Sequence, residues 1–316
     1  MSPSASLSGK TVLVTGARGF IGARLCTRLR DVGAEVHALS RYGGAAGSDA
    51  VEWHQGALDD PAVVEALVRS VAPDTVFHLA SAVSGDPGHD LVLPMLKSNL
   101  LGTVNLLGAV HAAGCRRLVV TGSVVEPRDD EPPTSPYAAS KWATTQYSRM
   151  FHSLYGTPVV CLRLGMVYGP GQKDAAKLIP HVVGALLRGE SPQVSSGLWE
   201  ADWVYIDDVI EALLLTSLAD GVDGETLDVG TGDVASVRNV VERLTEMIDG
   251  DAAANFGAVD DRPLPRPVRA DLGPTRKLLG WAPATSLLDG LKRTVTWHSS
   301  RLPSVMWFTD ATATTF

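Results

Sequence analysis

Tyr137 and Lys141 stand four residues apart in a segment with a helical pattern, so their side chains share one face. A phenol has a pKa of about 10 and is a poor acid–base catalyst at neutral pH. Because a neighbouring ammonium group stabilises the phenolate, we expect Lys141 to lower the pKa of Tyr137. Ser123 ends the preceding predicted strand, 117–123, where its hydroxyl can donate to a carbonyl oxygen. These three candidate catalytic residues predict interconversion of a ketone and an alcohol, with hydride moving at carbon and a proton moving through Tyr137.

A nicotinamide cofactor would supply the hydride, and residues 11–33 have the pattern of a dinucleotide-binding turn. An apolar run over 11–15 predicts a strand, and glycines follow at 16, 19 and 22. Apolar positions then recur at helical spacing until Gly33, which suits a helix end. Glycines in this context let the backbone approach a pyrophosphate and aim free N–H groups at it. We therefore predict a bound dinucleotide.

The end of the second predicted strand, 35–40, bears on which nicotinamide cofactor binds. An acidic residue there would meet the adenosine ribose of NAD(H), whereas arginine accommodates the 2′-phosphate of NADP(H). The chain has Ser40 and Arg41 at this place, and Arg18 lies inside the glycine turn. Two guanidinium groups can grip a phosphate monoester, although solvated surface arginines are the alternative interpretation. We favour NADP(H), with NAD(H) as the alternative.

Strands and helices alternate along the first half of the chain, which predicts an α/β fold with a parallel sheet. Asp60 and Pro61 have the residue types of an N-cap and a first helical residue, for a helix that runs to 71. We interpret His78, inside an apolar strand, as a buried structural group rather than a ligand. Further strands are predicted at 51–56, 75–80, 202–206 and 226–230, and further helices at 90–113, 175–188, 207–218, 236–248 and 287–298.

Composition excludes several classes of protein. The 316 residues are 45% hydrophobic and 20% charged, as in ordinary globular proteins. A net charge of -8 without a basic run argues against nucleic acid as a partner. Cys26, Cys115 and Cys161 form no metal or redox spacing, so we expect core thiols and no metal site. With no apolar leader and no run of about 18 uncharged apolar residues, we expect a cytoplasmic protein without a membrane partner.

Motifs along nearly the whole chain resemble those of the extended short-chain dehydrogenase/reductase family, which holds nucleotide-sugar epimerases, dehydratases and 4-ketoreductases. They are Thr15–Gly22, His78–Ala80, Asn99 with Gly102–Thr103, Ser123, Tyr137 with Lys141, Arg163 with Val167–Gly171, Asp202–Val209 and Leu279–Pro283. The resemblance implies a Rossmann-type doubly wound domain over 1–165, with 202–230 returning to it in part, and a smaller C-terminal α/β substrate domain over 166–316. It also implies a nucleotide sugar as the small-molecule substrate, and a homodimer formed through the helices near 90–113 and 137–155.

The resemblance also assigns binding residues. Those expected at the cofactor are Gly16, Arg18, Gly19, Phe20, Ile21, Gly22, Arg41, Leu58, Leu79, Ala80, Asn99, Tyr137 and Lys141. Those expected at the substrate are Ser81, Val124, Met166 and Arg262. In the proline-arginine loop 260–269, Arg262, Arg266 and Arg269 suit either a diphosphate or a solvated basic loop.

Some residues depart from the family pattern. Met166 and Ala201 replace an asparagine and an arginine that serve the substrate's nucleotide in many members, and Ala57 replaces an aspartate that meets the adenine. Val124 and Val125 replace the acidic pair that dehydratases use for elimination. We therefore expect reduction of a nucleotide-linked (dTDP-type) 4-keto-6-deoxyhexose by the reduced cofactor. The alternatives are a UDP-glucose 4-epimerase-like enzyme and, from another class, a non-catalytic dinucleotide sensor.

Overall fold

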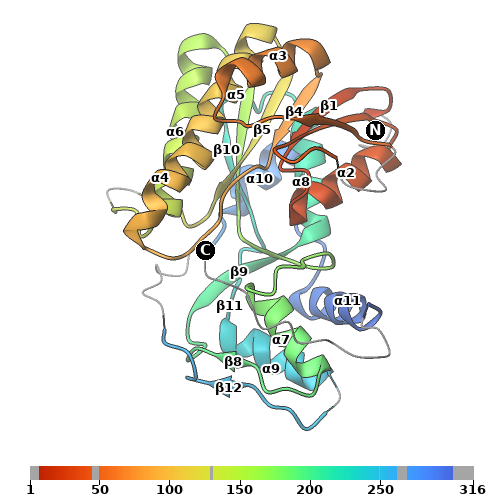
Figure 1. The fold of residues 1–316 in the computed structure, drawn as a ribbon, viewed down its shortest axis with the longest axis vertical. Coiled ribbons are helices and arrows are strands. Elements are labelled where there is room, and N and C mark those ends of the chain that lie inside the picture. The colour runs from red at the N-terminus through yellow and green to blue at the C-terminus, as the bar shows by residue number, and fades with distance from the viewer. Residues whose placement is uncertain (1–6, 45–49, 129–130, 249, 262–268, 302–316) are drawn as a thin grey trace.

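The chain folds around a seven-stranded parallel sheet (Figure 1). The structure is a computed structural model, and it describes residues 7–44, 50–128, 131–248, 250–261 and 269–301. The strand order is β10-β6-β5-β4-β1-β2-β3. Because β1 lies inside the sheet and the strand order runs outward on both sides of it, the sheet is doubly wound, as the sequence predicted. The strands are β1 (Thr11–Thr15), β2 (Glu35–Ser40), β3 (Glu52–Gln55), β4 (Thr75–His78), β5 (Arg117–Ser123), β6 (Val159–Leu164) and β10 (Thr226–Val229).

Helices cover both faces of this sheet. On one face, Leu13 of β1 packs in a cluster with Val64 and Leu67 of α3 (Pro61–Val71) and with Leu107 of α5 (Gly102–Ala113). On the other face, Val12 and Val14 of β1 share a core with α2 (Phe20–Asp31) and α8 (Ile206–Leu218). Alternate residues of one strand therefore enter two different cores, which explains why these strands are apolar throughout.

Local sequence accounts for several helix ends. The Asp60 carboxylate accepts hydrogen bonds from the N–H groups of Ala62 and Val63 at the start of α3, so the predicted N-cap is confirmed. The Ser135 hydroxyl caps α6 (Pro136–Tyr155) in the same way, by accepting from the N–H of Ala138. Gly33, predicted to end α2, has a φ of +80° and follows the C-cap Val32.

The helix predicted at 90–113 is real but irregular. It consists of a 3-10 turn η1 (His89–Leu91), α4 (Val92–Met95), a π-helical stretch η2 (Leu96–Leu101) and α5. In the part of the chain that the structure describes, His89–Ala113 is the one helical stretch that is long and apolar enough to cross a membrane. That test considers length and composition alone, and core helices of soluble proteins also pass it. Here α5 packs against α3 and α6.

The second half of the chain builds a smaller region at the lower end of Figure 1. A three-stranded sheet contains β7 (Met166–Tyr168), β9 (Glu200–Tyr205) and β11 (Val234–Ser236), and a two-stranded one contains β8 (Gln193–Val194) and β12 (Asn255–Phe256). Of the remaining helices of the described chain, α7 (Leu178–Leu187), α9 (Val237–Met247) and α11 (Leu287–Ser299) lie in this region, whereas α10 (Leu272–Leu279) packs against β10 of the large sheet (Figure 1). Within the segment 202–230, β10 joins the large sheet and α8 packs on α2, whereas β9 lies in the small sheet.

Candidate active site

The glycine turn between β1 and α2 brings two backbone segments into contact. Gly16 has a φ of +73°, and a Cβ atom built on it would lie 2.6 Å from the backbone nitrogen of Ala80. The N–H of Ala80 donates to the Thr15 hydroxyl at 3.3 Å, and the N–H of Leu79 donates to the Thr15 carbonyl at 3.2 Å. The chain leaving β4 is therefore fastened against the turn, and only glycine fits at position 16.

The start of α2 is suited to an anion. Gly19 is the N-cap residue, and no side chain caps the helix there. Phe20 and Ile21 are half-buried against the core, whereas Gly22 is fully buried beneath the turn. Uncapped N–H groups at a helix start, together with the helix dipole, favour phosphate groups. These residues thus fit the pyrophosphate of a dinucleotide.

The three predicted catalytic residues meet at the carboxyl end of β5. Ser123 ends β5 and is buried, and its hydroxyl forms a side-chain hydrogen bond with Tyr137. Lys141 lies one turn along α6 from Tyr137, with its Nζ atom 6.0 Å from the centre of the phenol ring. The Lys141 ammonium is buried and donates to the Thr121 carbonyl at 2.7 Å. In parallel α/β sheets this edge is where ligands bind.

The net pKa shift of Tyr137 is opposite to the direction expected from Lys141. Burial is the main cause that raises the pKa of Tyr137 to about 12; the hydrogen bond to Ser123 offsets part of the rise, and the charge of Glu126 adds a smaller one. Burial also lowers the pKa of Lys141 to about 8. Desolvation penalises the charged form of each side chain, and it is the largest cause of both pKa shifts. Tyr137 is therefore protonated at neutral pH, which is the form that can donate to a carbonyl.

Glu126 was missed by sequence reasoning, although it lies at the centre of this site. It is 3% exposed, and its Oε1 accepts the backbone N–H of Ser123 at 2.7 Å. Burial raises the pKa of Glu126 to about 7, while Arg163 and Lys141 lower it in part. Gly122 makes room for this carboxyl group, since a Cβ atom there would collide with Oε1. The signal in the sequence is that Glu126 stands only three positions after the end of the strand. A tight turn can therefore bring its carboxyl group back to the N–H at the strand end.

Asn99 holds the site together through other residues. Its Oδ1 accepts the N–H of Ala82 at 2.8 Å, and its Nδ2 donates to the Ala82 carbonyl at 3.0 Å and to the Ser140 hydroxyl at 2.9 Å. The side chain is 2% exposed. Asn99 thus ties the loop after β4 to α6, the helix that carries Tyr137. The structure gives this predicted cofactor residue a positioning role.

The end of β2 carries the predicted cofactor-selecting residues. Ser40 is buried, and its hydroxyl accepts the N–H of Tyr42 at 3.2 Å. Arg41 is exposed and lies 5.4 Å from the centre of the Tyr42 ring. Arg18 is also exposed and donates to the Gly43 carbonyl at 3.4 Å. Arg18 thus reaches the loop that begins at Arg41, so the two guanidinium groups flank the same segment.

The remaining predicted residues lie at several depths. Leu58 is half-buried, and its carbonyl accepts from Asn105 at 2.9 Å. Ser81 is half-buried, Val124 is buried at the end of β5, and Met166 is 38% exposed at the start of β7. Arg262 and Arg266 lie outside the described residues, whereas Arg269 is exposed and its carbonyl accepts from Arg128.

The interpretation of His78 as a structural group is confirmed. Its ring nitrogens lie 2.7 Å from the Thr15 hydroxyl and 2.9 Å from the Thr103 hydroxyl. Burial lowers the pKa of His78 to about 3, so the ring is neutral at physiological pH. The three cysteines are likewise free and buried, as expected of core thiols.

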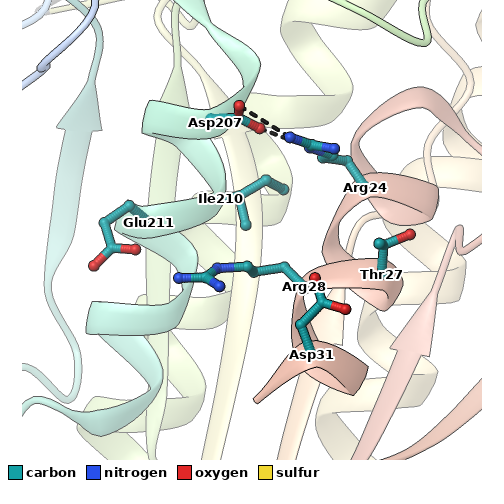
Figure 2. Close-up of a pocket in the computed structure, with 7 residues that line it drawn as sticks. All are labelled: Arg24, Thr27, Arg28, Asp31, Asp207, Ile210 and Glu211. Carbon is teal, nitrogen blue, oxygen red and sulfur yellow. Dashed lines mark hydrogen bonds and ion pairs between the residues drawn. The ribbon is translucent and has the colours of Figure 1, made fainter. Parts of the chain in front are cut away.

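A separate hollow of about 350 Å³ lies between α2 and α8 (Figure 2). The Arg24 guanidinium pairs with the Asp207 carboxylate across it at 2.6 Å. Its other charged walls, Arg28, Asp31 and Glu211, include both signs. It contains none of the predicted catalytic residues, and we interpret it as the seam between two packed helices.

The comparisons with known proteins agree with this geometry. Residues 12–230 match the model of the NAD dependent epimerase/dehydratase family. The chain is 31% identical to the UDP-glucose 4-epimerase of Mycolicibacterium smegmatis, over 90% of this chain and 96% of that protein. It is 29% identical to a dTDP-glucose 4,6-dehydratase of Xanthomonas campestris, over 91% and 93% of the two chains.

Solved structures of the same type superpose closely. The UDP-glucose 4-epimerase of Thermotoga maritima with UDP-glucose has a TM-score of 0.85 at 27% identity, over 93% of this chain and all of that one. The UDP-glucose 4-epimerase of Thermus thermophilus with NAD has a TM-score of 0.82 at 29% identity, over 92% of this chain and all of that one. The chain is therefore an enzyme that belongs to the NAD-dependent epimerase/dehydratase family.

Proposed function

We propose that this enzyme uses NADPH to reduce a nucleotide-linked 4-keto-6-deoxyhexose to the corresponding 6-deoxyhexose. The observation that carries the proposal is the end of β2, where Ser40 stands in place of a carboxylate and Arg18 and Arg41 flank the following loop. An exchangeable reduced cofactor suits net reduction, whereas an epimerase returns its hydride to the same sugar. Val124 and Val125, directly after Ser123, further disfavour dehydration.

The chain's own residues account for the proton transfer. The dinucleotide supplies hydride when bound. The Ser123 hydroxyl donates a hydrogen bond to the substrate carbonyl, and Tyr137, whose pKa burial raises, gives its proton to the same oxygen. Lys141 holds a positive charge one turn away and thereby stabilises the phenolate that results. Glu126 fixes the backbone of Ser123 and so positions its hydroxyl.

Epimerisation is the second candidate, because the relatives favour it. The proteins similar to this chain include UDP-glucose 4-epimerases, one of them solved with UDP-glucose and another with NAD. The same Ser123, Tyr137 and Lys141 would serve oxidation at C4 followed by reduction from the other face. The two reactions differ in whether added cofactor is consumed.

One experiment separates these candidates. Mass spectrometry of the denatured, purified protein identifies any retained nucleotide, and absorbance at 340 nm then follows NADPH and NADH with dTDP-4-keto-6-deoxyglucose. The reductase proposal expects steady NADPH consumption and a dTDP-6-deoxyhexose product. Retained NAD⁺, no net NADPH consumption, and interconversion of UDP-glucose and UDP-galactose would overturn it in favour of the epimerase. Absence of both reactions across a panel of keto-sugars would leave the sensor class.

Cofactor preference has its own test. Replacing both Arg18 and Arg41 by alanine should weaken NADPH binding by about tenfold or more and leave NADH binding within about twofold, because only NADPH carries the 2′-phosphate. Arg30→Ala, on the exposed side of α2, is the matched control. Tighter binding of NADH than NADPH by the unaltered protein would contradict the preference.

We also propose that a second copy of this chain covers the outer face of α4, η2 and α6. Leu93 is 65%, Leu96 46% and Trp142 43% exposed on neighbouring helices, which is unusual for large apolar side chains gathered on one surface. Sedimentation velocity should give a dimer for the unaltered protein and a monomer for Leu93→Glu with Trp142→Glu. Leu198→Glu, at a side chain 74% exposed elsewhere, should remain dimeric. A monomeric unaltered protein would refute this proposal.

We also propose a location for the protein. Its three free cysteines are buried thiols, which suits a reducing compartment, and we propose the cytoplasm.

A further inference from the structure

Two histidines and a glutamate come together on the β2–β3 edge of the large sheet, outside the residues assigned to cofactor or reaction. The parallel register pairs His37 of β2 with Glu52 of β3, and Leu39 with His54. Because side chains alternate along a strand, Glu52 and His54 point to the same face as His37. Leu13 and Leu39 on this face belong to the core under α3 and α5, so the cluster lies at the margin of that core.

The donor atoms of the three side chains converge. His37 Nδ1 lies 3.0 Å from His54 Nε2, and the two rings stack with an angle of 20° between their planes. Glu52 places Oε2 3.7 Å from His37 Nδ1 and Oε1 3.7 Å from His54 Nε2. Each carboxylate contact is longer than a hydrogen bond, so the hydrogen bond between the rings leaves Glu52 facing both nitrogens without bonding to either.

These separations match the edges of a metal coordination polyhedron. Zinc binds imidazole nitrogen and carboxylate oxygen at about 2.0–2.2 Å, which places neighbouring ligands of a tetrahedron about 3.3 Å apart. The separations of 3.0, 3.7 and 3.7 Å lie on either side of that value. Shifts of a few tenths of an ångström would bring all three donors to one ion: the two nitrogens would move apart, and the Glu52 side chain, which is 64% accessible, would move closer.

A second carboxylate, that of Glu35, faces the other ring nitrogen of buried His37. Glu35 Oε1 lies 3.6 Å from the other ring nitrogen of His37, Nε2, and Glu35 Oε2 accepts from the Thr11 hydroxyl at 3.2 Å. This contact is also longer than a hydrogen bond, but a negative charge facing Nε2 favours the tautomer with a proton on Nε2 and a lone pair on Nδ1. That lone pair points at His54 and Glu52. Metal-binding histidines usually have such an outer partner.

We propose that His37 Nδ1, His54 Nε2 and the Glu52 carboxylate bind a divalent transition-metal ion of the zinc type, with water at the remaining position. Two imidazoles and one carboxylate suit zinc, and disfavour magnesium, which takes oxygen ligands. Within its sheet β3 pairs with β2 alone. An ion held by one residue of β2 and two of β3 therefore fastens the edge strand, and it stabilises the folded state without taking part in the reaction.

Isothermal titration calorimetry of the full-length chain, free of any histidine tag, tests this site. ZnCl2 should bind with a stoichiometry of one, and the thermal midpoint should rise with zinc concentration. His54→Ala should weaken zinc binding by more than about 100-fold, and Glu35→Ala by about 10- to 100-fold, the range for outer-sphere partners. His89→Ala, an exposed histidine elsewhere, is the control and should bind as the unaltered protein does.

Two further measurements make the outcome decisive. Glu52→Gln alters only an exposed side chain, so it will fold even where a change at buried His37 does not, and it should also weaken zinc binding at least tenfold. MgCl2 should produce no binding heat at the same concentrations. Equal zinc affinity in His54→Ala and the unaltered protein, or equal binding of magnesium, would overturn the proposal.

Discussion

Oε1 of Glu126 accepts the backbone N–H of Ser123 at 2.7 Å, which links a buried carboxyl group directly to the end of the catalytic strand. The side chain comes from the loop just after β5 and fills the space left by Gly122. Because Tyr137 forms a hydrogen bond with the Ser123 side chain, Glu126 acts on the proton donor through Ser123. We expect changes at three residues of the candidate active site, and at one residue outside it, to have measurable effects.

Glu126 should make the folded state less stable as pH rises. Its pKa is about 7 in the folded protein against an ordinary value of 4.5, so the folded state keeps a proton that the unfolded chain loses in between. The free energy of unfolding should therefore fall from pH 4.5 to pH 7, by about 3 kcal/mol. Glu126→Gln keeps an acceptor for Ser123 and should remove this slope. Urea unfolding of both proteins from pH 5 to pH 8 checks it, and identical slopes would contradict the assignment.

Tyr137→Phe should abolish turnover while leaving the cofactor bound. Loss of the proton donor should lower kcat by about 100-fold or more, whereas the affinity for NADPH should change by less than about threefold. Tyr147→Phe, on the exposed side of the same helix, is the matched control and should retain activity. Stopped-flow NADPH oxidation and fluorescence titration provide the two readouts. Full activity in Tyr137→Phe would contradict the assignment of Tyr137 as the proton donor.

Gly16→Ala should lower the free energy of unfolding by more than backbone strain alone would. Gly16 and Gly9 both have positive φ, +73° and +71°, but a Cβ atom at position 9 meets nothing within 4 Å. Gly9→Ala should thus destabilise the protein by about 1 kcal/mol, and Gly16→Ala by about 2–3 kcal/mol or more, because the new methyl group collides with the Ala80 backbone. Denaturant unfolding of the pair separates strain from collision. Equal losses would show that the contact with Ala80 relaxes freely.

Removing the negative charge of Asp228 should destabilise the folded state more than removing most other charges. Its side chain is 1% exposed and pairs with Arg128 at 2.7 Å and Arg163 at 2.6 Å, so it joins β10 to β6 and to the loop after β5. Asp228→Asn leaves these arginines without a counter-charge and should destabilise the fold by about 3 kcal/mol. Asp220→Asn, at a 99% exposed partner of Arg116, should change stability by less than about 0.5 kcal/mol. Thermal and urea unfolding of both variants test the contrast.

Sequence reasoning located the elements whose signals are local. The glycine turn, the Asp60 cap and the pairing of Tyr137 with Lys141 depend on residues within about one helical turn of each other. The structure places all of them as expected, and the parallel order of the large sheet follows from the alternation of strands and helices. By contrast, β8 and β12 are two residues each and some sixty residues apart, so no periodicity could reveal them.

The rest depended on burial and register, which one sequence does not display. Whether Lys141 lowers the pKa of Tyr137 depends on how much water reaches the pair, and burial reversed the expected direction. His37 and His54 are 17 positions apart with no ligand spacing, and only the register of β2 against β3 brings them together. The metal site proposed for these histidines therefore has no signal in the spacing of residues along the chain.

The π-helical stretch Leu96–Leu101 has a consequence for how this gene can change. A π turn accommodates one residue more than a regular α-helical turn, so removing a single residue there would give a more regular helix. Such a deletion would leave the helical segments on either side in their present phase, so its effect would fall on the stretch itself, where Asn99 would shift relative to its partners Ala82 and Ser140. A deletion that helix propensity alone would favour is thus expected to be removed by selection, although most side chains of this stretch are exposed in the single chain.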